Sequence, residues 1–209
     1  GPPRRIGAIV ADAQLPSLRI VDARLAELSQ QAAWTGLALT RINEELSAAL
    51  SPLERQRNAG EGLSGGGNVA SLAAGLRTID VCLPPRIIGA PDSVLTLLLR
   101  NVGALPAGWS VRYPTDMELQ VEHWAEAGET SADDLKQHMI LDHRIMSASR
   151  KRGDVEPGDE QSLQLRMRHV RADEYVLPLL FQLAQGKWLV LNLRGRTLAD
   201  GESCVHIPP

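Results

Sequence analysis

The chain has 209 residues, of which 44% are hydrophobic and 22% charged, and its formal net charge is -3. This length is enough for one well-packed core with appendages, or for two small domains. The small negative charge gives no overall attraction to nucleic acid or to an acidic membrane surface, so neither is expected as a partner. No stretch approaches the roughly 20 consecutive apolar residues that a membrane-spanning helix needs.

The cysteines and the start of the chain bear on its cellular context. Cys82 and Cys204 occur without a signal-like apolar run near the start. This combination predicts free thiols in a reducing, cytosolic compartment, and a disulfide between them is the less favoured alternative. Because the chain begins with Gly1-Pro2 and not with methionine, we expect it to be a piece of a larger protein.

The N-terminal third passes from no pattern to a short strand and then to helix. Residues 1–16 have no clear periodicity and are expected to form an extension, whereas residues 18–21 follow the Leu15-Pro16 breaker and predict an edge strand. A helical run is expected over residues 22–33, and a longer amphipathic one follows, with apolar residues at every third or fourth position. The apolar positions of the longer stripe are Leu39, Ile42, Leu46, Leu50 and Leu53.

The amphipathic stripe has two interpretations. We expect it to pack on the domain's own sheet, as amphipathic helices ordinarily do. The alternative is a docking surface or a short coiled coil for a neighbouring protein, but too few heptads are present to favour the coiled coil. Pro52 should bend or end the helix unless it stands at the first position of a new one.

A glycine-rich stretch follows at residues 58–68. Its letters from Gly60 to Gly65 match a dinucleotide-binding fingerprint, but that site needs a strand before the glycines and a helix after them. Here a helical pattern comes first and Gly66-Gly67 follows, and no Gly-Lys-Ser/Thr ending of a P-loop exists. The stretch is therefore interpreted as a flexible linker.

Apolar residues alternate with polar ones from Leu76 onward, which is the pattern of strands with one buried face. The alternation predicts three strands before residue 114, and their inward positions are Ile79, Val81 and Leu83, then Leu95, Leu97 and Leu99, then Trp109, Val111 and Tyr113. Trp109 is the expected central aromatic of the core, because its ring can bury the largest area. A cofactor box around Trp109 is the less favoured alternative.

Residues 114–129 are acidic and contain no Lys or Arg. Alternation of Met117, Leu119 and Val121 predicts a strand whose outward face is acidic. Glu118 and Glu122 could serve acid-base chemistry, but a solvated face offers no pocket to shift their pKa values. A short helix is then expected from Ser131 to about Ile140.

The last third of the chain predicts antiparallel sheet. Leu163, Leu165 and Met167 share one side of a strand. Two longer alternating runs, at residues 175–183 and 189–193, are separated by Gln185-Gly186 and predict a β-hairpin. Ahead of these strands, an extended lead runs from Ile145 through Gly153 and Val155 to Pro157-Gly158. Pro presets the first corner of a turn, and Gly accepts the positive φ that follows it.

These motifs resemble a known family. The serine-containing lead that ends in Gly153-x-Val155-x-Pro157-Gly158, the Leu-Pro-Leu-Leu strand at residues 177–180 and the final strand from Trp188 look like the second half of an immunoglobulin-like sandwich of the major sperm protein and ASH (hydin-type) superfamily. Earlier in the chain, the run ending at Asn101 resembles the early strands of the ASH type. The resemblance implies an all-β, immunoglobulin-like antiparallel β-sandwich with a helical insertion near the N-terminus.

The expected domain organisation follows from these elements. Residues 1–16 form an extension, residues 17–75 hold the edge strand, the helices and the glycine-rich loop, residues 76–198 form the sandwich, and residues 199–209 form a tail. The resemblance further implies a non-catalytic protein-protein interaction module of a larger ciliary, axonemal or centrosomal scaffold. It implies cytoskeletal localisation at a cilium, axoneme or basal body, ciliary or microtubule-associated protein partners, and no cofactor.

Basic residues cluster around the lead and the strand after it. The predicted partner-binding patch consists of Arg144, Arg150, Lys151, Arg152, Arg166 and Arg168. Together with the acidic run at residues 114–129, the patch would make the domain dipolar and steer an acidic partner such as the tubulin surface. The alternative is that these charges only keep the surface solvated, because Asp154 and Glu156 interrupt them.

Two rival functions are weaker. No His or Cys spacing gives a metal shell, and no nucleophile motif accompanies Asp142-His143. A carbohydrate- or lipid-binding sandwich would need an apolar cleft lined by Trp124 or Trp188. An enzyme would need its titratable groups to converge, and the group to check is Glu118, Glu122, Asp142 and His143.

Overall fold

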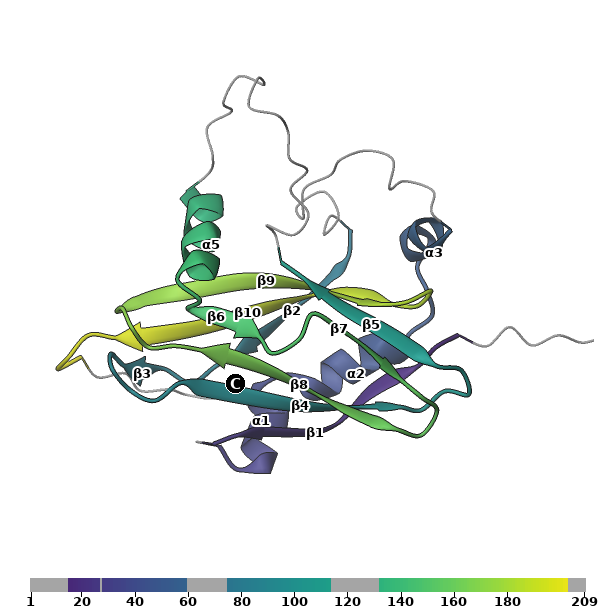
Figure 1. Cartoon of the computed structure of the whole chain (residues 1–209), viewed down its shortest axis with the longest axis horizontal. Coiled ribbons are helices and arrows are strands. Elements are labelled where there is room, and N and C mark those ends of the chain that lie inside the picture. The colour runs from purple at the N-terminus through teal and green to yellow at the C-terminus, as the bar shows by residue number, and fades with distance from the viewer. Residues whose placement is uncertain (1–14, 27, 60–74, 114–131, 203–209) are drawn as a thin grey trace, which may run out of the picture.

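The computed structural model describes residues 15–26, 28–59, 75–113 and 132–202. Two β-sheets pack face to face (Figure 1). The first sheet has the order β1 (Leu18–Leu25), β4 (Ser93–Asn101), β8 (Glu160–Met167) and β6 (Met146–Ala148). The second has the order β2 (Arg77–Cys82), β10 (Trp188–Leu198), β9 (Asp173–Leu183), β5 (Ala107–Arg112) and β7 (Arg152–Val155), with the short β3 (Arg86–Ile87) also pairing with β10. The predicted immunoglobulin-like sandwich is confirmed.

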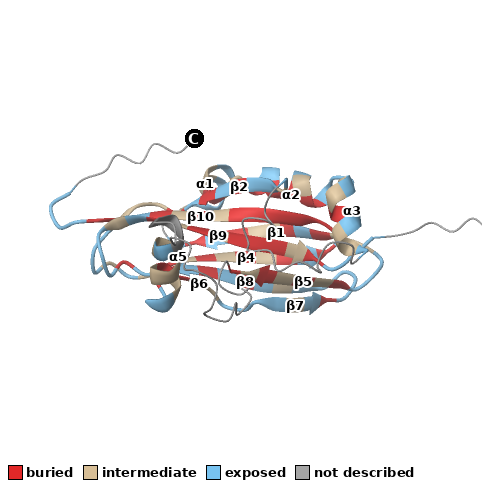
Figure 2. Ribbon diagram, turned by 90° about the horizontal axis from the view of Figure 1, so that it is seen from above, coloured by how far each residue is buried: buried red, intermediate tan, exposed pale blue. Residues whose placement is uncertain are grey.

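The inward positions of the strands form one continuous core. Leu97 of β4 pairs with Leu163 of β8, and both side chains are at most 2% exposed. From the second sheet, Trp109 stacks on Phe181 with ring centroids 6.1 Å apart. Each fully buried Leu or Phe contributes roughly 2 kcal/mol, which makes this interior the main source of stability. Figure 2 shows buried residues along the central strands of both sheets.

Two pairings differ from a wholly antiparallel sandwich, those of β2 and of the short β3 with β10. β2 runs parallel to β10, with Ile79 beside Leu191, whereas β10 and β9 form the predicted antiparallel hairpin around Gln185 and Gly186. A hairpin forces antiparallel pairing, but β2 enters its sheet after a long helical connection from β1, so its direction is not fixed by a turn. The second sheet is therefore mixed.

The helical connection between β1 and β2 contains α1 (Gln30–Gly36), α2 (Leu39–Ser47) and α3 (Pro52–Asn58). Buried residues of α1 and α2 belong to the same core as the two sheets, and both helices contact β1. Asn43 of α2 accepts a hydrogen bond from the Ile20 N–H (2.8 Å) and donates one to the Ile20 carbonyl (2.9 Å). The amide thus satisfies the backbone of an edge strand where the β1 register shifts.

Two helix predictions were wrong in detail. Residues 22–25 belong to β1 and not to a helix, because Ala23 and Leu25 pair with Leu97 and Leu95 of β4 and are buried there. Tertiary pairing overrides the helix propensity of this segment. The apolar stripe is also divided: α2 ends at Ser47, Ser51 caps the next helix, and Pro52 stands at its first turn.

The predicted Pro-Gly turn is confirmed. Gly158 has φ +84° and the Asp159 N–H donates to the Glu156 carbonyl at 3.0 Å. The Gly158 N–H donates to the Asn101 carbonyl (3.0 Å), which joins the Pro-Gly turn to the end of β4.

A second glycine, Gly153 in β7, lies beside the hydrogen bond that the Trp109 Nε1–H donates to Gln161 Oε1. A Cβ at this position would overlap with the Gln161 side chain.

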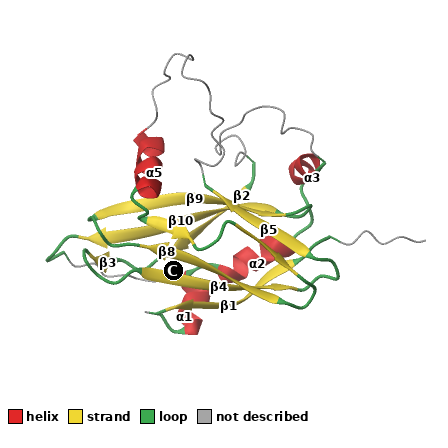
Figure 3. Ribbon diagram, viewed as in Figure 1, coloured by secondary structure: helices red, strands yellow, loops and turns green. Residues whose placement is uncertain are grey.

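Helices also cover the outer side of the second sheet. α3 and α5 (Ala132–Asp142) lie over it at opposite ends (Figure 3). The predicted helix from Ser131 to Ile140 agrees with α5 to within two residues at its end. The acidic strand predicted at residues 114–129 lies outside the described residues. So do residues 60–68 of the predicted glycine-rich loop, whose first residue, Asn58, ends α3. Among the helices that the structure describes, none has the length and apolarity required to traverse a bilayer.

Candidate interaction surfaces

The predicted basic patch lies along one long side of the sandwich. β6 ends the first sheet and β7 ends the second, so the segment between them crosses from sheet to sheet. The Ser149 N–H donates to the Gln164 carbonyl of β8 (2.8 Å), whereas the Lys151 carbonyl accepts from the Val111 N–H of β5 (2.7 Å). Arg150 therefore stands at the crossing itself. We call this side the basic edge, consisting of Arg144, Arg150, Lys151, Arg152, Arg166 and Arg168.

Local contacts orient several of these cations. Arg168 Nη1 donates to the His143 carbonyl (3.3 Å), and Arg166 Nη1 lies 3.6 Å from Asp92 Oδ2. Lys151 Nζ lies 4.7 Å from the centre of the Tyr113 ring, whose hydroxyl accepts a hydrogen bond from the Ala148 N–H (2.7 Å). All six basic residues are exposed. Arg150 and Lys151 lie on the crossing segment and Arg152 on the short edge strand β7, where positive charge also hinders edge-to-edge pairing with other sheets.

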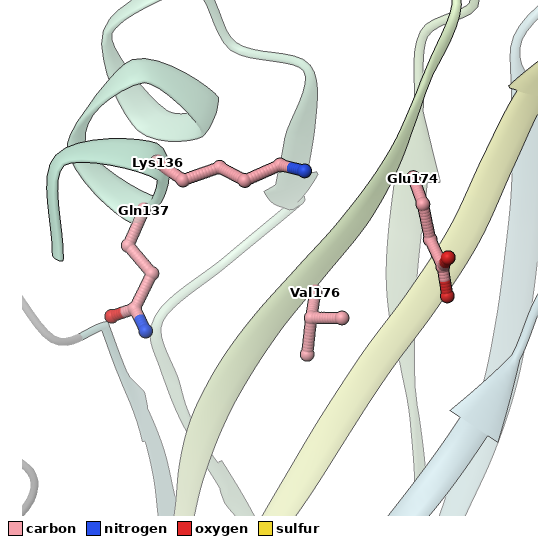
Figure 4. Close-up of a pocket in the computed structure, with 4 residues that line it drawn as sticks. All are labelled: Lys136, Gln137, Glu174 and Val176. Atoms are coloured by element: carbon pink, nitrogen blue, oxygen red, sulfur yellow. The ribbon is translucent and has the colours of Figure 1, made fainter. Parts of the chain in front are cut away.

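A hollow of about 320 Å³ lies between α5 and β9 (Figure 4). Lys136 and Gln137 leave α5 in different directions, and Glu174 lies across β9 from them (Figure 4). Lys136 Nζ is bonded to Asp173 Oδ1 at 3.1 Å and lies 5.9 Å from the Tyr175 ring centre. Burial opposes ionisation of Asp173, but this hydrogen bond and the Glu174 N–H lower its pKa. The Lys136 ammonium group therefore links α5 to β9. The residues that line this hollow do not form a converging pair for acid-base catalysis.

A second hollow, of about 300 Å³, lies beside α3 and includes Trp188 in its lining. Its walls are charged: Lys187 pairs with Glu54 at 3.0 Å and Arg77 with Glu45 at 3.0 Å. Trp188 is only 2% exposed, and its Nε1–H donates to Asn58 of α3 (2.8 Å). This is not the apolar cleft that a lipid or sugar site requires. Trp124 lies outside the described residues.

Glu54 is the buried charge that holds α3 to the sheet. Its carboxylate accepts hydrogen bonds from the Trp188 N–H (3.0 Å), the Ser51 N–H (2.7 Å) and Lys187 Nζ (3.0 Å). Burial alone would raise the pKa of Glu54, and these bonds more than offset it, so the pKa lies below its usual value. Sequence reasoning missed this residue; the Ser-x-x-Glu capping box at residues 51–54 was its only local signal.

The histidines do not form a site in the described part of the chain. His169 is 2% exposed and bridges the sheets through Ser93 Oγ (3.0 Å) on β4 and Thr197 Oγ1 (3.0 Å) on β10. Burial, and then the charge of Arg86, lower the pKa of His169. No group of three metal-binding side chains occurs among the described residues.

The residues proposed for a hypothetical enzyme site are only partly described. Asp142 and His143 are exposed at the end of α5. Glu118 and Glu122 lie outside the described residues, as do His123, His206 and Cys204. Cys82 carries a free thiol.

Comparison with known proteins settles the family. The family model described as "Cilia- and flagella-associated protein 65-like, Ig-like domain" matches residues 16–195 of the chain. The chain belongs to this family. The match confirms the resemblance to a ciliary immunoglobulin-like domain that was inferred from the Pro157-Gly158 lead and the strands that follow it. It also includes β1 and the three helices, which the resemblance alone did not cover.

Relatives of this Ig-like domain are much longer proteins. The chain is 35% identical to human cilia- and flagella-associated protein 65 over 117 residues, which is 56% of the chain and 6% of the human protein. It is 22% identical to the Chlamydomonas reinhardtii protein of the same name over 206 residues, 98% of the chain and 10% of that protein. Among solved structures, the ASH / PapD-like domain of human CEP192 is similar with a TM-score of 0.39, 15% identity, and coverage of 59% of this chain and 84% of that one.

Proposed function

We propose that this Ig-like domain is a non-catalytic protein-protein interaction module of a larger ciliary or flagellar scaffold, and that its basic edge binds an acidic protein surface such as that of tubulin. The observation that carries the proposal is the grouping of six exposed cations around the segment that crosses from β6 to β7 and on or beside the adjacent strand β8. Names of the relatives support the ciliary location. Separated charge of this kind acts mainly on association rate and orientation.

The chemistry of the basic edge suits a protein surface more than a small molecule. Its cations are exposed and line neither of the two hollows described above, where Lys136, Lys187 and Arg77 are each paired with a carboxylate. An acidic surface can engage several such cations at once, whereas each exposed pair alone contributes at most about 1 kcal/mol. Binding should therefore weaken steeply as salt is raised.

Microtubule co-sedimentation tests the basic edge. Reversing Arg150, Lys151 and Arg152 to Glu should reduce the bound fraction at low salt at least tenfold. A matched control reverses Arg19, Arg41 and Arg55 to Glu, which makes the same change in net charge at exposed positions on β1, α2 and α3. The proposal fails if both triple variants bind like the wild type, or if both lose binding equally.

Location is tested separately in the parent protein. Antibody staining or a fluorescent tag should place it in the cilium or flagellum, and it should remain with the axoneme after detergent extraction. A parent protein that is extracted completely with the membrane and matrix fraction would remove the scaffold assignment, whatever the basic edge binds in vitro.

A further inference from the structure

Large apolar side chains are exposed mainly at the two ends of the sandwich. Seven of them are at least 42% exposed in the described part of the chain. Leu15, Val102 and Leu105 lie at one end, which we call the Asn101 pole, and Ile87, Ile88 and Val170 lie at the other, which we call the His169 pole. The seventh, Leu135, lies outside these loops, on α5 over the outer side of the second sheet. Single exposed apolar residues are ordinary, but six gathered at two ends indicate contact surfaces.

The two poles are opposite ends of the same strands. β4 begins at Ser93, which is bonded to His169, and ends at Asn101. β1 starts by pairing Leu18 with Asn101, and β10 finishes by pairing Leu198 with Ile87. The chain thus enters its first strand at one pole and leaves its last strand at the other (Figure 1).

Both pole loops lack charge and have a fixed backbone. Residues 101–107 and 87–91 contain no charged side chain, in a chain that is 22% charged. Asn101 Nδ2 donates to the Leu105 and Val155 carbonyls (2.8 Å each), and its Oδ1 accepts from the Gly103 N–H (2.9 Å). At the other pole, Ile88 N–H donates to Leu198 (2.9 Å) and Gly89 N–H to His169 (2.7 Å). Loops fixed in this way bind with little further loss of conformational entropy.

We infer that each pole packs against an adjacent Ig-like domain of the same polypeptide, apolar loop against apolar loop. Three half-exposed side chains per pole fall well short of the roughly 1,200 Å² that a stable complex between separate proteins buries. A tethered neighbour needs less, because its effective concentration is of millimolar order. Relatives of which this chain spans only 6% and 10% have ample length for such neighbours, and the matching family model is that of a ninth domain. The inference concerns other surfaces than the basic edge and does not depend on its partner.

Hydrogen-deuterium exchange tests the inference by comparing the 209-residue chain with the full-length protein that contains it. Amides at residues 102–105 and 87–90 should exchange at least tenfold more slowly in the full-length protein. Equal exchange in the two forms would overturn the inference. So would concentration-dependent dimerisation of the 209-residue chain through the poles, because that result assigns them to a second copy.

A pair of variants separates contact at the pole from general destabilisation. In the full-length protein, Ile88→Glu should abolish the protection at residues 87–90, and the control Leu135→Glu, an exposed apolar residue on α5 outside both pole loops, should leave it intact. Ile87→Ser provides a milder change at a 52% exposed position should Ile88→Glu prevent folding. Protection that survives both pole variants would contradict the assignment.

Discussion

The two long sides of this sandwich are closed by opposite means. On the side of β1 and β2, helices α1 and α2 insert Leu37, Leu39 and Ile42 into the common core, each at most 2% exposed. On the side of β6 and β7, a single segment crosses between the sheets and exposes Arg150, Lys151 and Arg152. The comparison teaches that an edge can be sealed by apolar packing or protected by exposed charge.

Truncation on the helical side should have the largest effect. Ile42→Ala removes a side chain that lies between α2 and both sheets, beside Leu97 and Leu191. We expect the free energy of unfolding to fall by about 3 kcal/mol, since a cavity is left in a close-packed interior. The melting temperature should drop by roughly 6 to 12 °C. A loss below about 1 kcal/mol in chemical denaturation would show that α2 only rests on the sandwich.

The edge of β1 should depend on one amide. Asn43→Ala leaves the buried N–H and C=O of Ile20 without their side-chain partner, which should cost about 2 kcal/mol of unfolding free energy. The matched control is Asn192→Ala, whose Nδ2 donates to Asp80 Oδ1 at an exposed site (3.0 Å) and whose loss should cost about 0.5 kcal/mol or less. Equal losses in the two variants would mean that the β1 edge is satisfied by other groups.

A pH titration of stability probes the buried contact of His169 with Ser93 and Thr197, which lies on neither of the two long sides. His169 has a folded-state pKa below its unfolded value, so the unfolded chain binds a proton first as the solution is acidified. Stability should therefore be full above about pH 6.5 and fall below it, with a slope of at most about 1.4 kcal/mol per pH unit. His169→Gln should flatten this part of the profile. A flat wild-type profile between pH 6.5 and 5 would contradict the prediction.

The basic edge should give the smallest change in stability. Replacing Arg150, Lys151 and Arg152 by Ala removes exposed charges and the contact of Lys151 with the Tyr113 ring. We expect the free energy of unfolding to change by less than about 1 kcal/mol. Urea denaturation of this variant beside Ile42→Ala measures the contrast directly. A loss comparable to that of Ile42→Ala would show that the edge is structural and not available for binding.

Local alternation was a sound guide to the strands. Leu95, Leu97 and Leu99 are buried as predicted, and so are Trp109, Val111 and Tyr113, because a strand in a sandwich repeats every two residues whatever lies far away. The same rule could not detect that residues 22–25 pair with β4, or that β2 is parallel to β10. Those features are set by partners that lie 70 residues or more along the chain, and a local pattern carries no information about them.

The polar contacts were the least predictable part. Three of the hydrogen bonds join residues that are far apart in the sequence. Asn43 bonds to Ile20 at a separation of 23 residues, His169 to Ser93 at 76, and Glu54 to Lys187 at 133. Only Glu54 has a local signal, the capping box at residues 51–54, and the sequence around Asn43 and His169 does not distinguish them from solvated side chains. The basic edge could be proposed from sequence because its central residues are adjacent in the chain, whereas the crossing between sheets that exposes them appears only in the structure. The charge-free loops of the two poles were visible as uncharged runs, but their position at opposite ends was not.

The placement of the first and last strands at opposite ends has a mechanical consequence. A pull applied between Leu18 and Leu198 acts along β1 against β4 and along β10 against its neighbours, so the backbone hydrogen bonds of each ladder are loaded together in shear and not opened one after another. We expect such a domain to resist force better along this axis than when it is pulled from a loop at one end, a difference that single-molecule stretching with the two attachment geometries would measure.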